Sequence, residues 1–271
     1  MSRSDQDWTA LCEKVKQLVP KEISEQTWIL ITAATLATSP STELMANFYS
    51  HLTRNDPSFH SKESQHRLSL QFRDILLKLI TLVGAPRVLC VLMPLAQAEG
   101  DVERKSANSV LNNKWKPENM DVQAIFDRGL TTINAIYGSS LLDKVFASWG
   151  SHKEDVRFNE LFAIYGLYLS DFDVLTALEA EAVIYATISC LGLGGPGNWH
   201  LRGMGRMLGA RGTDQDSAEA QNITEQLNNL REAVQTVVRF VGDDFVHNAK
   251  LDKWATVESM LGEFKNWSDD E

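Results

Sequence analysis

The stretch that decides the fold is QHRLSLQFRDILLKLITLVGAPR, which covers residues 65–87. From Leu68 to Val83 its apolar residues recur three or four positions apart, which is the spacing of one face of an amphipathic α-helix. Gly84 is the residue type that commonly ends a helix, and Pro86 lies where a proline is tolerated, in the first turn of a following helix. The stretch therefore predicts a helix over 65–83 and a second helix directly after it.

The same periodicity extends over almost the whole chain. It predicts further helices over residues 8–18, 25–37, 41–52, 121–137, 141–149, 155–169, 172–191 and 215–241, with a short amphipathic helix over 254–264. After the glycine-rich turn at 192–197, we expect Asn198 to cap another helix, which ends near 209–212. No stretch alternates apolar and polar residues between turn signals, as a strand would, so the predicted fold class is all-α.

Two segments look like degenerate copies of one helical hairpin. In the first, Asp74 leads along an apolar helix to Pro86, and in the second, Glu181 leads to Pro196 through a longer loop. We therefore expect two helical halves, residues 1–150 and 151–271, of which the second carries the candidate site. No long linker separates them, so the halves are expected to form one compact unit.

The composition argues against several classes of protein. The 271 residues include 26 Lys and Arg against 36 Asp and Glu, a net charge of −10, and no dense basic run, so no nucleic-acid partner is expected. The longest apolar run, residues 28–37, is too short to span a membrane, and no membrane partner is expected. Cys12, Cys90 and Cys190 are too far apart to suggest a disulfide framework or a CxxC pair, which favours a reduced, cytoplasmic location.

Glu181 and His200 are the residues that we expect to carry chemistry. Glu181 lies in a largely apolar helix, where a carboxylate is costly unless it has a partner. His200 is expected in the first turn of the next helix, where the helix dipole disfavours a protonated ring. A tight turn joins the two helices, so they are expected to pack antiparallel and to bring the two side chains together as an acid/base pair. The alternative is that Glu181 braces a neighbouring helix while His200 packs beside Trp199.

The order of residues around this pair resembles a known family. Glu181 is followed, after 18 residues, by HLRG at 200–203 and then by LGA at 208–210. This pattern resembles that of the carboxymuconolactone decarboxylase and alkyl hydroperoxidase D superfamily. Residues 76–87 are similar to the first half of its two-repeat, fungal-type members. Together with residues 126–129 and 136–138, the likeness covers roughly residues 65–240. The resemblance implies an all-helical fold of two degenerate hairpin repeats and a homo-oligomer, a dimer or larger.

The resemblance implies two different activities. The hydroperoxidase branch has a CxxC before its histidine, and the corresponding positions here are Leu193 and Pro196, so a thiol peroxidase-like oxidoreductase is only an alternative. The decarboxylase branch keeps the acid and the histidine. It implies a cofactor-free enzyme that uses Glu181 and His200 to decarboxylate or isomerise a small-molecule substrate, an organic acid or a lactone. Arg202 and Trp199 are the expected substrate-binding residues.

A noncatalytic structural oligomer is the remaining alternative, and it differs from an enzyme in whether the Glu181–His200 pair lines a solvent-connected cavity.

Cys190 is expected to be an inert core thiol. The other five histidines lack HxxxH or HExxH spacing, so no metal site is expected. Tyr137, Tyr165 and Tyr168 are expected to be core aromatic residues. An oligomer is also expected because the apolar stripes of the N-terminal helices and of 215–241 look more extensive than one core requires.

Overall fold

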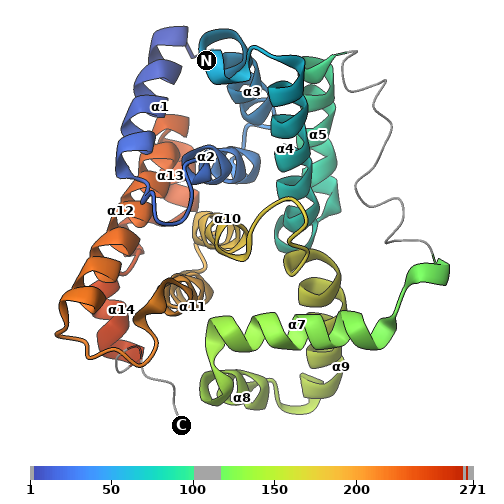
Figure 1. The fold of residues 1–271 in the computed structure, drawn as a ribbon, viewed down its shortest axis with the longest axis vertical. Coiled ribbons are helices and arrows are strands. Elements are labelled where there is room, and N and C mark those ends of the chain that lie inside the picture. Colours follow the sequence, from blue (N-terminus) through green and yellow to red (C-terminus); the bar gives the residue numbers. More distant parts are fainter. Residues whose placement is uncertain (1–2, 101–116, 265–266, 268–271) are drawn as a thin grey trace.

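The computed structural model describes residues 3–100, 117–264 and 267, and these residues form an all-α fold, as the periodicity predicts. Within this part of the chain there are thirteen α-helices and no β-strand. In Figure 1, α1 to α5 lie in the upper part of the molecule, α7 to α9 lie below them, and α12 runs along one side. The N-terminal and C-terminal helices thus lie around the same central elements.

The helices have the following bounds. The α-helices are α1 (Asp5–Leu18), α2 (Thr27–Thr38), α3 (Leu44–Asn55), α4 (Lys62–Val83), α5 (Ala85–Glu99), α7 (Val122–Tyr137), α8 (Ser139–Ser148), α9 (Lys153–Asn159), α10 (Ala177–Cys190), α11 (Gly194–Gly205), α12 (Ala218–Val241), α13 (Asp243–Asn248) and α14 (Val257–Phe264). Two π-helices, η4 (Glu160–Leu169) and η5 (Arg206–Ala210), continue α9 and α11. Short 3-10 turns occur at η1 (Pro57–Phe59), η2 (Pro117–Asn119), η3 (Gly150–His152) and η6 (Leu251–Lys253).

The centre of the fold is made by α2 and α10, which Figure 1 shows nearly end-on in the middle of the molecule. Every residue of α2 from Thr27 to Ala37 is buried, and so is every residue of α10 from Glu179 to Cys190. A helix that is apolar on all sides is stable only when neighbouring elements cover it completely. Here α2 packs against α10, α12 and α4, while α10 also packs against α11 and α4.

The buried apolar residues do not divide at residue 150. One cluster extends over α1 to α5 and also includes residues of α10 to α12. The second joins α7 and α8 to η4, and it includes Ile184 and Ile188 of α10. Elements before and after residue 150 therefore share both apolar clusters.

The turn between α10 and α11 is shorter than the sequence suggests. Helix α11 begins at Gly194, and its N-cap residue is Leu193, so the prediction that Asn198 caps this helix is wrong. Pro196 lies in the first turn, where a proline costs no hydrogen bond because those backbone N–H groups have no partner within the helix. The glycine-rich segment is therefore mostly helix. The start of α10 is set by a capping box between Thr176 and Glu179, five residues later than the predicted start at 172.

Helix α7 and the π-helix η4 approach each other closely at two glycines. A Cβ atom added at Gly129 would lie 2.0 Å from the carbonyl oxygen of Leu161, and one at Gly166 would lie 2.6 Å from that of Ile125. The absence of a side chain at both positions is what permits this backbone contact. Arg128 adds hydrogen bonds from its guanidinium group to the carbonyl oxygen of Gly166. These contacts hold together two of the elements that contribute to the wall of the candidate site.

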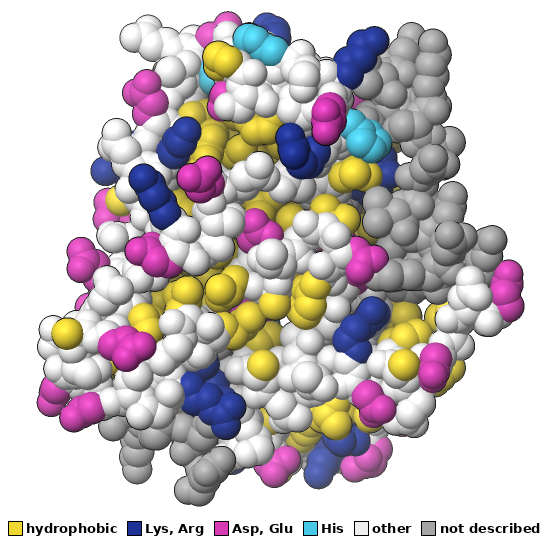
Figure 2. Space-filling model, in the orientation of Figure 1, with side chains coloured by type: hydrophobic (Ala, Val, Ile, Leu, Met, Phe, Trp, Pro, Cys, Tyr) yellow, Lys and Arg dark blue, Asp and Glu magenta, His cyan; other side chains and the backbone are white. Residues whose placement is uncertain are grey.

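The apolar stripes on which the oligomer was expected are buried within one chain. Trp8, Leu11 and Val15 of α1 are covered, and the stripe of α12 from Leu227 to Val238 is buried against α1 and α2. This premise was wrong because α1 and α12 cover each other, and the oligomer itself stays a prediction. Figure 2 shows charged side chains of both signs scattered over the visible face, without a large basic patch. Among the described helices, none is both long enough and apolar enough to cross a bilayer.

Candidate functional site

Glu181 and His200 meet in the interior of the molecule. The Nδ1 atom of His200, on α11, lies 2.7 Å from Oε1 of Glu181, on α10, and each residue is only 2% exposed. An ionised carboxylate is only an acceptor, so Nδ1 of His200 carries the hydrogen and donates it to Glu181. This leaves the lone pair of Nε2 on the opposite side of the ring. Glu181 therefore both has its partner and orients the histidine.

The helix dipole does not act on His200 in the way that the sequence suggests. Because α11 begins at Gly194, His200 is the seventh residue of the helix and not part of its first turn. The field of a helix terminus falls off within the first turn, so the predicted effect on the ring was wrong. The hydrogen bond to Glu181 is the interaction that defines which nitrogen of the ring faces outward.

Two tyrosines continue the hydrogen-bonded series beyond His200. The hydroxyl oxygen of Tyr137 lies 3.3 Å from Nε2 of His200, and the hydroxyl of Tyr165 donates to that of Tyr137 at 3.5 Å. Burial raises the pKa of both tyrosines, so each hydroxyl stays a hydrogen-bond donor. The series runs from Tyr165 through Tyr137 and His200 to Glu181, with every donor directed toward the carboxylate. Both tyrosines are buried, as predicted for core residues. Their hydroxyl groups, however, form part of the candidate site.

A cavity of about 280 Å³ opens beside His200, and Tyr137 and Tyr165 also line it. Much of its wall is apolar, and the apolar lining residues are Leu82, Ile133, Leu142, Val145, Phe146, Trp149, Ile164, Leu169, Ile188, Pro196 and Trp199. The cavity is partly open to solvent, and the exposed residue Ser148 is among those that line it. Its volume suits a small organic molecule. Glu181 does not line it, so a ligand would meet the pair through His200.

Trp199 is half-buried and forms part of the cavity wall, and its role in binding a substrate stays a prediction. Its ring lies 5.9 Å from that of Tyr137, measured between centroids. Arg202 lies elsewhere, because residues two apart in an α-helix point to different sides and His200 faces the cavity. It is 1% exposed and donates from Nη1 to the carbonyl oxygen of Tyr137 at 3.3 Å. Arg202 thus contacts the backbone that carries Tyr137 rather than the cavity.

Glu160 is a cavity residue that the sequence did not lead us to expect. It is the first residue of the π-helix η4 and lines the cavity together with Tyr165 and His200. Hydrogen bonds in a π-helix run from residue i to i+5, so Glu160 and Tyr165 fall on the same side, whereas an α-helix would separate them. Burial raises the pKa of Glu160, and interaction with His200 opposes that shift. No helical periodicity in the sequence predicts this carboxyl group in the site.

The thiols lie outside this site. Cys190 is buried at the end of α10, and burial raises the pKa of its thiol, which disfavours the reactive thiolate. Of the two positions where the resemblance would place a CxxC, Leu193 is exposed, and Pro196 forms part of the cavity wall. Cys190 is therefore a core residue, as predicted.

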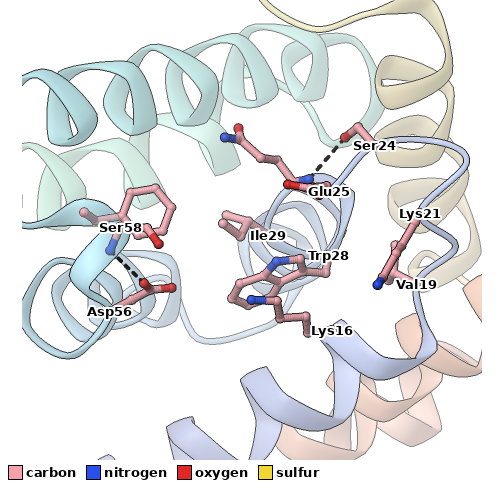
Figure 3. Close-up of a pocket in the computed structure, with 11 residues that line it drawn as sticks. Lys16, Val19, Lys21, Ser24, Glu25, Trp28, Ile29, Asp56 and Ser58 are labelled. Carbon is pink, nitrogen blue, oxygen red and sulfur yellow. Dashed lines mark hydrogen bonds between the residues drawn. The ribbon is translucent and has the colours of Figure 1, made fainter.

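A second cavity, of about 290 Å³, lies between α1, α2 and η1 (Figure 3). Here Lys16 lies over the ring of Trp28, 5.8 Å from its centroid, and Asp56 accepts a hydrogen bond from the backbone of Ser58 at 2.9 Å. Asp56 also caps the short helix η1, so its contact has a local structural role. This cavity contains no aligned acid/base pair comparable to Glu181 and His200.

In the described ranges, no group of three or more His, Cys, Asp or Glu side chains is arranged to hold a metal ion. The Glu181–His200 pair is thus the best-developed chemical arrangement in the structure.

Comparisons of the chain with protein-family models, with curated proteins and with solved structures gave no match. The family resemblance of the sequence motif accordingly stays a prediction.

Proposed function

We propose that this protein is a cofactor-free acid/base enzyme that decarboxylates or isomerises a small organic acid or lactone. The observation that carries the proposal is the 2.7 Å hydrogen bond between Glu181 and His200, because it turns Nε2 of a buried histidine toward a cavity. An imidazole whose orientation is set by a carboxylate is the commonest kind of general base in enzymes, and in His200 the lone pair of Nε2 contacts only the hydroxyl of Tyr137 at 3.3 Å among the hydrogen bonds described above. The resemblance to the decarboxylase branch supports the same pair of residues.

The arrangement suits proton transfer at a carbon next to a carbonyl group, a step that isomerisation and decarboxylation share. In isomerisation, Nε2 of His200 takes a proton from this carbon, and the hydrogen bond to Glu181 stabilises the resulting imidazolium. The substrate carbon takes the place of the Tyr137 hydroxyl at Nε2, and that hydroxyl then donates to the carbonyl oxygen, on which negative charge develops. The same proton then returns from Nε2 to another carbon of the substrate. In decarboxylation, loss of CO₂ leaves the carbanion, and Nε2 of His200 passes to it a proton that the imidazole has first taken up from water.

The proposal is tested by hydrogen–deuterium exchange, which needs only the shared proton-transfer step. A panel of small lactones and ketones is incubated with the protein in D₂O, and exchange next to the carbonyl is followed by proton NMR. We expect Glu181→Gln and His200→Asn each to lower the exchange rate by roughly 10²-fold or more. The double variant should be little slower than either single variant, because the two residues act as one unit.

His247→Asn serves as the matched control, because His247 is exposed and lies on α13, outside the cavity lining. Its exchange rate should equal that of the wild type. If the wild type catalyses no exchange with any member of the panel, or if the single variants exchange at the wild-type rate, the acid/base proposal is wrong. The second outcome would favour a noncatalytic role in which Glu181 and His200 only brace α10 against α11.

A further inference from the structure

The charges around the cavity separate the two substrate classes left open above. Among the described residues that line the cavity, none is Lys or Arg. Its lining includes one carboxyl group, that of Glu160, and a second carboxylate, that of Glu181, lies directly behind His200. The site therefore offers acidic groups, hydroxyl groups and apolar walls to a ligand.

Two arginines on elements around the cavity, Arg202 and Arg157, are not among its lining residues. Arg202 is buried and donates to the carbonyl oxygen of Tyr137. Arg157 of α9 lies over the ring of Phe146, 5.6 Å from its centroid, and it is not a lining residue.

His200 is the one described lining side chain that can become a cation, and it already has two carboxyl partners, Glu181 and Glu160. A carboxylate in the cavity would therefore lose its hydration without gaining a cation of its own, which is costly in a largely apolar site.

An uncharged carbonyl group loses less hydration than a carboxylate and finds hydrogen-bond donors in the cavity. Its oxygen can accept from the hydroxyl of Tyr137 or from that of Tyr165, both of which remain donors. In its acid form Glu160 can also donate to such an oxygen, and in its ionised form it would repel a carboxylate. The rings of Phe146, Trp149 and Trp199 can cover an apolar body of the ligand.

We infer that the cavity takes an uncharged carbonyl compound with an apolar body, such as a ketone or a lactone without an acid group. The inference rests on the proposed function, since His200 is taken as the base that meets this ligand. It selects isomerisation over decarboxylation, because decarboxylation needs a substrate whose carboxylate leaves as CO₂. In isomerisation the proton that His200 removes returns to another carbon of the same molecule, so no co-reactant is required.

The inference is tested by binding, with two probes of similar size that differ in charge. 4-Phenylbutan-2-one is an uncharged ketone, and 3-phenylpropanoate is the carboxylate of matching length. Their affinities are measured by isothermal titration calorimetry at about pH 7.5, where the second probe is ionised. We expect the ketone to bind at least about tenfold more tightly than the carboxylate.

Variants then test whether the cavity charge causes this preference. Glu160→Lys introduces a cation into the cavity wall, so the carboxylate should then bind more tightly than the ketone. Glu160→Gln only removes a carboxyl group and should make the difference between the two affinities smaller. Val145→Trp fills the cavity from the half-buried surface of α8 and should weaken binding of the ketone. Arg239→Gln, at an exposed arginine of α12 outside the cavity lining, is the control and should leave both affinities unchanged. Circular dichroism establishes that each variant is folded.

Equal or tighter binding of the carboxylate by the wild type would overturn the inference, and so would the absence of ketone binding. Ketone binding that is unaffected by both Val145→Trp and Glu160→Lys would also contradict it, since the probe would then bind elsewhere. The calorimetry needs no turnover, so it separates this inference from the proposed function. If the ketone binds selectively but its protons do not exchange, the acid/base proposal fails while the charge preference stands.

Discussion

At the scale of single residues, the structure shows how charged groups are accommodated in apolar helices. Glu181 is covered by its partner His200, and Asp74 of α4 is covered in a similar way by Lys78. Nζ of Lys78 lies 2.9 Å from Oδ2 of Asp74 and also donates to the carbonyl oxygen of Asp171 at 2.8 Å. Lys78 is 1% exposed and Asp74 is 8% exposed, so neither can exchange its partner for water.

Lys78→Met should destabilise the protein by about 3–5 kcal/mol at neutral pH, because it leaves the Asp74 carboxylate buried without its cation. Burial raises the pKa of Asp74, and Lys78 opposes this rise, so removing Lys78 raises that pKa further. When folding raises the pKa of a carboxyl group, the free energy of unfolding decreases as the pH rises above the pKa that the group has in the unfolded chain. The loss of unfolding free energy in Lys78→Met, relative to the wild type, should therefore be smallest at about pH 4 and should grow toward neutral pH.

Urea unfolding at several pH values measures this effect. The double variant Asp74→Leu/Lys78→Met is the matched control, since it removes both charges and should be far more stable than Lys78→Met at neutral pH. A loss in Lys78→Met that does not change with pH would show that packing, and not the charge of Asp74, sets the cost.

At the scale of secondary structure elements, the contact between α7 and η4 is the feature on which the candidate site depends. Helix α7 carries Tyr137, and η4 carries Glu160 and Tyr165, so their separation decides how these groups face His200. The two backbones approach each other where Gly129 and Gly166 have no side chain. A small change in this contact should therefore be transmitted to the cavity.

Gly129→Ala should destabilise the protein by about 1–3 kcal/mol or more, because the new Cβ atom would lie 2.0 Å from the backbone oxygen of Leu161. Backbone cannot move aside as a flexible side chain can, so α7 and η4 must separate. The matched control is Gly262→Ala in α14, where a Cβ atom meets nothing within 4 Å and better helix propensity should raise the stability slightly. Thermal unfolding compares the two variants. Equal unfolding temperatures would mean that α7 and η4 can separate without loss of stability.

At the scale of the whole molecule, one prediction concerns assembly. The stripes of α1 and α12 are covered within the chain, yet Leu89, Leu92 and Met93 of α5 remain exposed. Exposed apolar residues gathered on one helix favour association, and the family resemblance also implies an oligomer. We expect light scattering to give at least twice the 30.3 kDa of one chain at micromolar concentrations. A single-chain mass over that whole range would contradict this prediction.

The sequence by itself determined the fold class and most of the helices of this protein. Residues 65–83 predicted α4, which extends over Lys62–Val83, and Gly84 ends that helix with a positive φ, the conformation that glycine adopts most readily. These features follow from local periodicity and from the conformational preferences of single residues. The pairing of Glu181 with His200 was also predicted, because the cost of a buried carboxylate and the short turn between two helices are both visible in the sequence.

Only the tertiary structure decided the position of His200 within α11, the direction of Arg202 and the cavity itself. The helix start was misplaced because glycine and proline at 194–197 are typical of turns, yet they form the first turn of α11. Tyr137, Glu160 and His200 come from three different elements, and no local pattern relates their positions. Glu160 faces Tyr165 because η4 follows π rather than α periodicity, and the hydrogen-bonding pattern of a helix held by its neighbours cannot be read from its residues alone. Packing between distant elements therefore brings together the groups that surround the candidate base.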